Sequence, residues 1–172
     1  IKWQSRSTAS SYTVAYNDAG KNIRAVLSYT DGEGFTESVT TSFITISSNL
    51  IFRGTSGDDT LNGGYRTDTF YGYDGDDTIK GLGGDDIAYG GNGNDIMHGN
   101  HGDDTFRGGV GNDFLTGAGG EDALYGGSGD DRLNGGAGKD NLFGNVGDDR
   151  LNGQHGDDTL RGGSGDDRLN GG

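Results

Sequence analysis

Apolar residues recur at every ninth position through the larger, C-terminal part of the chain. From residue 54 to residue 170 the sequence divides into thirteen consecutive nonapeptides. Positions seven to nine of each are expected to form a short strand, in which only the middle side chain points to one face. The eighth position therefore predicts a core column, which consists of Leu61, Phe70, Ile79, Ala88, Met97, Phe106, Leu115, Leu124, Leu133, Leu142, Leu151, Leu160 and Leu169.

Glycine and aspartate occupy the other fixed positions of the nonapeptide. Glycine stands at position one of every repeat and often at two and four, where it allows a positive φ and a tight turn. Aspartate stands at position six without exception, and a hard divalent cation prefers such carboxylate and carbonyl oxygens. The candidate metal ligands are Asp59, Asp68, Asp77, Asp86, Asp95, Asp104, Asp113, Asp122, Asp131, Asp140, Asp149, Asp158 and Asp167.

The pattern Gly-Gly-x-Gly-x-Asp-x-apolar-x, clear in residues 126–134, resembles that of the repeats-in-toxin (RTX) family. The resemblance implies an all-β fold, a right-handed parallel β-roll with two nonapeptides per coil, in which odd and even repeats build separate sheets. It also implies calcium between loops one coil apart, held by the position-six aspartates and glycine carbonyls. Pairing the seven odd and six even loops gives about eleven sites. Arg66 replaces the position-four glycine of repeat two, so the site at Asp68 is expected to be weak or empty.

Composition and charge make a cation necessary for this fold. The chain has 38 glycines, 28% hydrophobic residues and no cysteine, which leaves little material for an ordinary core or a disulfide framework. Residues 54–172 hold eight basic and twenty-three acidic residues, a net charge of −15. Stacked acidic loops repel each other unless cations lie between them. Without calcium the segment is therefore expected to be disordered, and calcium binding becomes folding free energy.

Residues 1–47 follow a different pattern, because apolar side chains alternate with polar ones along 12–16 and 23–29. This alternation predicts antiparallel strands, with a hairpin turn at 31–34 leading into a strand over 35–46. The segment resembles the second half of an immunoglobulin-like β-sandwich repeat of large bacterial surface proteins. We therefore expect a partial Ig-like antiparallel segment at 1–47, a junction with an N-terminal cap strand at 48–53, and a β-roll of thirteen repeats at 54–172. The whole is expected to be a fragment of a larger protein.

The sequence offers no candidate catalytic or cofactor-binding residue, so we expect a protein that is not an enzyme. His98, His101 and His155 are the three histidines, and they lack zinc-binding spacing. The neighbouring aspartates suit metal loops better than an acid and base in unequal environments. The acidic balance disfavours nucleic acid and bare membrane surfaces, and no apolar run is long enough for membrane insertion.

These features predict a calcium-binding structural module of a large RTX protein of the adhesin or surface-layer type. The resemblance implies type I secretion from a Gram-negative bacterium and folding on calcium outside the cell, in a secreted, extracellular or cell-surface protein. Two alternatives remain: the non-catalytic tail of an exoenzyme (protease, lipase or polysaccharide-modifying enzyme), and a glycan-binding solenoid. Beside calcium, the candidate partners are cell-surface glycans and other copies of the parent protein. The glycan surface would be the even-sheet column Tyr71, Tyr89, Tyr125 and Phe143, which ordinary cross-strand pairing also explains.

Overall fold

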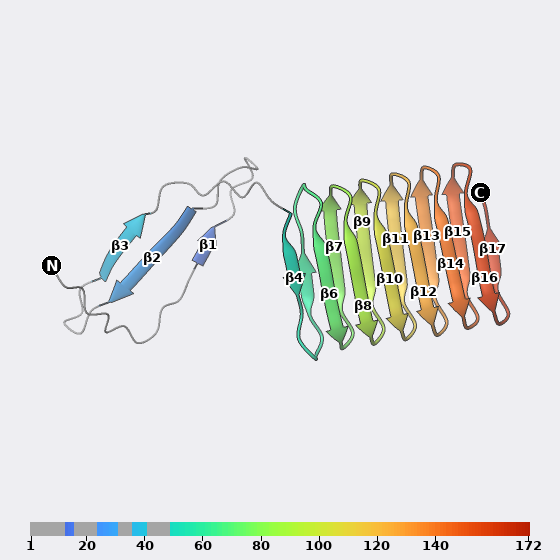
Figure 1. Cartoon of the computed structure of the whole chain (residues 1–172), viewed down its shortest axis with the longest axis horizontal. Coiled ribbons are helices and arrows are strands. Elements are labelled where there is room, and N and C mark those ends of the chain that lie inside the picture. Colours follow the sequence, from blue (N-terminus) through green and yellow to red (C-terminus); the bar gives the residue numbers. More distant parts are fainter. Residues whose placement is uncertain (1–12, 16–23, 31–35, 41–48) are drawn as a thin grey trace. The chain divides into compact units, whose positions relative to one another are not determined.

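The computed structural model of the chain describes residues 13–15, 24–30, 36–40 and 49–172 (Figure 1). The chain divides into two compact units, Ile1–Ser48 and Asn49–Gly172. The finer domain boundaries expected from the sequence stay predictions.

The N-terminal unit contains a small antiparallel sheet of three strands. Strands β1 (Thr13–Ala15), β2 (Arg24–Thr30) and β3 (Thr36–Thr40) are ordered β1-β2-β3. Both pairings are antiparallel, as the alternating pattern predicts. The expected turn at 31–34 and the expected strand beyond residue 40 lie outside the described residues, and the Ig-like assignment stays a prediction.

The C-terminal unit is an all-β solenoid of about seven turns built from two parallel sheets (Figure 1). One sheet has the order β16-β14-β12-β10-β8-β6-β4 and the other β17-β15-β13-β11-β9-β7-β5. The strands are β4 (Ile51–Arg53), β5 (Thr60–Asn62), β6 (Thr69–Asp74), β7 (Thr78–Gly83), β8 (Ile87–Asn92), β9 (Ile96–His101), β10 (Thr105–Val110), β11 (Phe114–Gly119), β12 (Ala123–Ser128), β13 (Arg132–Ala137), β14 (Asn141–Val146), β15 (Arg150–His155), β16 (Thr159–Ser164) and β17 (Arg168–Asn170).

The register confirms two nonapeptides per coil. Each strand pairs with the strand two further along the chain, so that Phe106 lies opposite Leu124 and Leu115 opposite Leu133, eighteen residues apart. Even repeats therefore build the sheet that begins with β4, and odd repeats build the other. This arrangement is consistent with a β-roll, whereas its right-handed winding stays a prediction. In the part of the chain that the structure describes, no helix is long and apolar enough to cross a membrane.

Twelve of the thirteen eighth positions form the core, as predicted, whereas Leu169 in the terminal strand β17 is 48% exposed, which corrects the prediction there. Ten of these side chains are 0–2% exposed, namely Phe70, Ile79, Ala88, Met97, Phe106, Leu115, Leu124, Leu133, Leu142 and Leu151. Phe52, Leu61 and Leu160 pack against them and are partly buried. Burying each large apolar side chain contributes about 1.5–3 kcal/mol. The core is thus a single file of side chains between two sheets, and the loops lie along its two edges.

Candidate metal centre

Eleven loops of the solenoid, those of repeats three to thirteen, share one backbone conformation. Positions two and four of each have φ between 74° and 141°, and we call these the regular loops. Position four is glycine in all eleven. A Cβ added at Gly111, for example, would collide with the carbonyl oxygen of Gly93 one coil earlier. Glycine is therefore required at position four both by φ and by the close approach of successive coils.

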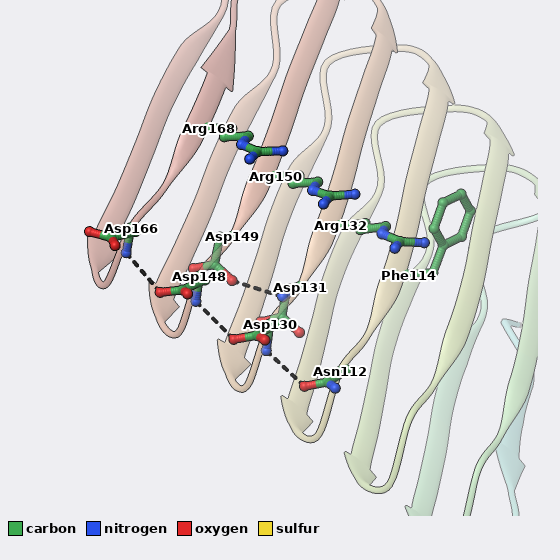
Figure 2. A pocket seen from close by; sticks show the side chains of 10 residues that line it. All are labelled: Asn112, Phe114, Asp130, Asp131, Arg132, Asp148, Asp149, Arg150, Asp166 and Arg168. Atoms are coloured by element: carbon green, nitrogen blue, oxygen red, sulfur yellow. Dashed lines mark hydrogen bonds between the residues drawn. The ribbon is translucent and has the colours of Figure 1, made fainter.

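The position-six aspartates from Asp68 onward are turned into the solenoid and bonded to the residue eighteen positions earlier. Asp68 and the nine position-six aspartates from Asp77 to Asp149 are 0–2% exposed. Their Oδ1 atoms accept the N–H of the residue eighteen positions earlier; for example, the N–H of Asp86 donates to Asp104 at 2.8 Å. Figure 2 shows the same bond between the N–H of Asp131 and Asp149. These bonds fix the carboxylates in a row along each edge of the solenoid.

The second oxygen of these carboxylates is buried without a hydrogen-bond partner. This holds for Oδ2 of Asp77, Asp86, Asp95, Asp104, Asp113, Asp122, Asp131, Asp140, Asp149 and Asp158. The Oδ2 atom lies beside the position-one glycine of its own repeat, where a main-chain carbonyl of the next coil also approaches. A Cβ added at Gly99 would collide with Asp104 Oδ2 and lie 2.9 Å from the carbonyl oxygen of Gly117. Carboxylate and carbonyl oxygens thus converge, which is the donor set that calcium takes.

Burial without compensation raises the pKa of these aspartates. The pKa rises to about 8 for Asp104, to about 7 for Asp86, Asp95 and Asp131, and to about 6 for Asp113 and Asp122. Loss of hydration is the largest cause, the bond from the backbone N–H lowers the pKa, and nearby carboxylates raise it again. A bound cation would favour the ionised form by supplying the missing positive charge. The residues present therefore fit a calcium ion.

The RTX calcium-binding nonapeptide repeat matches this chain in four copies, at residues 53–88, 80–115, 116–151 and 143–172. Together they cover the whole solenoid from β5 onward. The chain belongs to the RTX calcium-binding repeat family. No curated protein matches the chain.

A second ladder of RTX loop side chains, at position five, is exposed and runs in the opposite sense. Along the odd edge, the Oδ1 atom of each position-five side chain accepts the N–H of the residue eighteen positions later, at 2.7–2.9 Å. Figure 2 shows three of these bonds, which link Asn112, Asp130, Asp148 and Asp166. On the even edge the row is interrupted at position five by Lys139 and Thr67, whose side chains have no Oδ1 atom. Position five therefore braces neighbouring loops from outside, while position six faces inward.

The odd edge also carries a hollow of about 630 Å³ between its loops and the outer face of the sheet (Figure 2). Arg132, Arg150 and Arg168 lie beside the aspartates and form one column of this face. Figure 2 marks no hydrogen bond between these arginines and the other labelled residues. The buried aspartates Asp131 and Asp149 line the inner part of the hollow.

The first coil of the RTX solenoid, residues 54–71, departs from this arrangement in both of its loops. Neither Thr55 and Gly57 in loop one nor Gly64 and Arg66 in loop two has a positive φ. Asp59 Oδ2 accepts the N–H of Thr55 at 2.6 Å and its hydroxyl at 2.9 Å. Asp68 Oδ2 accepts the N–H of Gly64 at 3.0 Å. In this coil the second carboxylate oxygen is thus satisfied by its own loop.

The sequence identifies one of these two departures and misses the other. Arg66 marks loop two, as expected. Thr55 was not singled out, although its β-branched side chain at position two is the signal, since such residues rarely adopt a left-handed conformation. In the regular loops position two holds Gly, Tyr, Leu, Asn, Ala or Gln, and never a β-branched residue.

No cluster of three or more Asp, Glu, His or Cys side chains suited to a metal occurs among residues 13–15, 24–30, 36–40 and 49–172. The RTX centre instead combines one inward carboxylate per loop with main-chain carbonyls. His98 lies in strand β9 with its ring centroid 6.0 Å from that of Phe114, and burial lowers its pKa. The role of the thirteen aspartates as calcium ligands stays a prediction.

Proposed function

We propose that this chain is a calcium-dependent structural module of a secreted or cell-surface protein of the adhesin or surface-layer type, with the position-six aspartates as its calcium ligands. The observation that carries the proposal is the row of ten buried Oδ2 atoms without hydrogen-bond partners. A buried ionised group without a partner costs several kcal/mol, and here that cost recurs from the second coil onward. A divalent cation is the natural group to remove it.

Each residue of the loop would contribute one part of the calcium site. The Oδ1 atom of Asp104 keeps its backbone hydrogen bond and orients the carboxylate. Its Oδ2 atom and the carbonyl oxygen of Gly117 approach the same point. Gly99 leaves that point free because it has no Cβ. Calcium, when bound, supplies positive charge and oxygen coordination between successive loops.

Folding would then depend on the calcium concentration around the protein. Residues 54–172 have a net charge of −15, and their core is one side chain wide. Extracellular calcium modules typically have dissociation constants of about 10⁻⁴–10⁻³ M, above cytosolic calcium. The chain would remain unfolded inside a Gram-negative cell, pass through a type I exporter and fold outside.

A calcium titration of the chain followed by circular dichroism tests this function. We expect a cooperative transition from coil to β-structure that chelator reverses. The variant Asp104→Asn, which removes an inward carboxylate charge, should need more calcium to fold. The matched control is Asp103→Asn, at the exposed position five of the same loop, which should fold at the wild-type calcium concentration. Folding of the wild-type chain in chelator, or equal effects of the two variants, would contradict the proposal.

The even-sheet aromatic column, the candidate glycan surface, forms a continuous stack. Tyr71 and Tyr89 stack with ring centroids 5.2 Å apart, and Tyr125 and Phe143 stack at 4.9 Å. Arg107 lies between the two pairs, 5.9 Å from the Tyr89 centroid and 4.6 Å from that of Tyr125. The ring faces are thus turned toward one another and toward a guanidinium, which leaves mainly their edges for a sugar. This geometry favours cross-strand pairing over glycan stacking. An enzyme elsewhere in the parent protein remains the other alternative.

A further inference from the structure

The first coil differs from the rest of the solenoid in three features: the conformation of its loops, the hydrogen bonds of its carboxylates and the length of its strand. Its positions two and four are not left-handed, whereas both are left-handed in all eleven regular loops. Its carboxylates at Asp59 and Asp68 are closed by hydrogen bonds from their own loops. Strand β5 ends after three residues, whereas each strand from β6 to β16 has six.

Each loop of the first coil has one residue that explains its conformation. Loop one has Gly57 at position four but Thr55 at position two, and a β-branched side chain disfavours the left-handed region. Loop two has Gly64 at position two but Arg66 at position four, where every regular loop has glycine. In the conformation that results, which lacks a positive φ at positions two and four, the N–H of position two reaches Oδ2 of position six. That hydrogen bond occupies the oxygen that a cation would need.

The pairing of regular loops fixes how many complete sites remain. The unpaired Oδ2 atom of a regular loop faces the loop one coil later, as Asp104 and Gly117 show. The regular loops comprise six in the odd stack and five in the even stack, which gives five and four neighbouring pairs. Nine of the ten unpaired carboxylates, those from Asp77 to Asp149, belong to these pairs, and the tenth, Asp158, is followed one coil later only by Gly171 and Gly172. The two remaining pairs of the eleven expected sites begin in the first coil, at Asp59 and Asp68.

We propose that the first coil, residues 54–71, binds no calcium, and that the solenoid takes nine ions with its first site at Asp77. The first coil is a metal-free cap in which hydrogen bonds from Thr55 and Gly64 replace the cation. A calcium ion at Asp59 would have to displace the Thr55 N–H and hydroxyl, and one at Asp68 would approach the Arg66 loop. This inference rests on the proposed function, since it assigns calcium among the position-six aspartates.

The number of ions in the folded, calcium-saturated chain tests the assignment. Native mass spectrometry and elemental analysis of the 172-residue chain should both give nine ions. The double variant Asp59→Asn/Asp68→Asn should keep nine ions and the wild-type calcium midpoint by circular dichroism. The matched double variant Asp95→Asn/Asp104→Asn should fall to seven. Eleven ions in the wild-type chain, or a loss of ions from the first-coil variant, would overturn the inference.

A converse variant keeps the test decisive if the first-coil asparagine variant fails to fold. Thr55→Gly/Arg66→Gly gives both loops the glycine that the left-handed conformation requires, and the count should rise from nine to eleven. A count that stays at nine would overturn the assignment of Thr55 and Arg66 as the cause. Failure of the proposed function itself would give a different result. A chain that folds without calcium, or that binds no ions, would show the same folding and the same ion count in all of these aspartate variants.

Discussion

In the first coil the second oxygen of Asp59 accepts two hydrogen bonds from Thr55, whereas in the middle of the stack the same oxygen of Asp104 is buried with no hydrogen bond. Both residues stand at position six, and both are followed by a strand with an apolar middle residue. The difference lies in the backbone at positions two and four of the loop. An aspartate at the consensus position therefore does not by itself leave an unpaired carboxylate oxygen, which depends on the backbone of its loop.

The comparison also separates two sources of stability in one solenoid. Core packing and strand pairing continue from the first coil into the next, because Leu61 and Ile79 lie opposite each other in register. What changes is how the loop carboxylate is neutralised. In the first coil the chain satisfies Oδ2 with its own N–H groups, whereas from Asp77 to Asp158 the chain offers Oδ2 no hydrogen-bond donor, and the proposed calcium would take that place.

The largest difference in stability between a regular loop and the first coil should come from adding a methyl group to a position-four glycine. Gly111 has φ +134°, and a Cβ there would collide with the Gly93 carbonyl. Gly111→Ala should lower the free energy of unfolding in calcium by about 2–4 kcal/mol, from the backbone conformation and the overpacking together. Gly57, at the same position of the first coil, has no atom within 4 Å of an added Cβ and lacks a positive φ.

Gly57→Ala is therefore the control for Gly111→Ala, and its effect should stay within about 1 kcal/mol. Thermal and urea unfolding at fixed calcium measure both variants. Equal destabilisation would show that the first-coil loop adopts the regular conformation in solution.

A smaller effect should come from pH, through the buried carboxylates of the regular loops. Their pKa values are raised by burial, to about 8 for Asp104 and about 7 for Asp95. In the unfolded chain the same carboxylates have the ordinary Asp pKa of about 4, so they are ionised above about pH 6, as they would be in a calcium-bound fold. The calcium concentration at the folding midpoint should therefore change little between about pH 6 and about pH 8, because these groups release no protons when calcium folds the chain.

The stability of the calcium-free fold should instead depend on pH over this range. Because the folded pKa lies above the unfolded one, protonation stabilises this fold at acid pH, and that stability is lost as pH rises through about 6–8. Calcium titrations at several pH values, with a chelator series beside them, measure both trends. A content of β-structure in chelator that does not rise as pH falls from about 8 to about 6 would contradict the trend expected for the calcium-free fold.

The smallest effect should come from Thr55→Val, which removes the hydroxyl bond to Asp59 and keeps the N–H bond and the β-branched side chain. The expected loss is about 0.5–1.5 kcal/mol, the usual net contribution of one hydrogen bond. The number of bound ions should stay the same, and local hydrogen exchange in the first coil measures the change. Thr116→Val, in strand β11 away from any loop carboxylate, is the control. A change confined to the last coils would contradict the local role given to Thr55.

The nine-residue pattern predicts the strands, the buried eighth positions and the separation of odd and even repeats, because each depends on side chains at fixed spacing. It also predicts Arg66 as a departure. It does not predict the bond from Thr55 to Asp59. Which group bonds to a position-six carboxylate depends on the φ angles of its loop, and the presence of aspartate at position six does not determine those angles. The opposed ladders of positions five and six likewise require the coil register, which pairs residues eighteen apart.

The two ladders give each coil a fixed relation to its neighbours. Position five bonds to the coil that follows, and position six to the coil that precedes. Every contact of this kind spans eighteen residues, however many coils the solenoid has. The cost in chain entropy of closing such a loop is therefore the same for every added coil. Repeats can therefore be gained or lost in pairs without creating a contact of longer range. The number of coils in such a solenoid is free to vary in evolution, while the entropic cost of adding one coil stays constant.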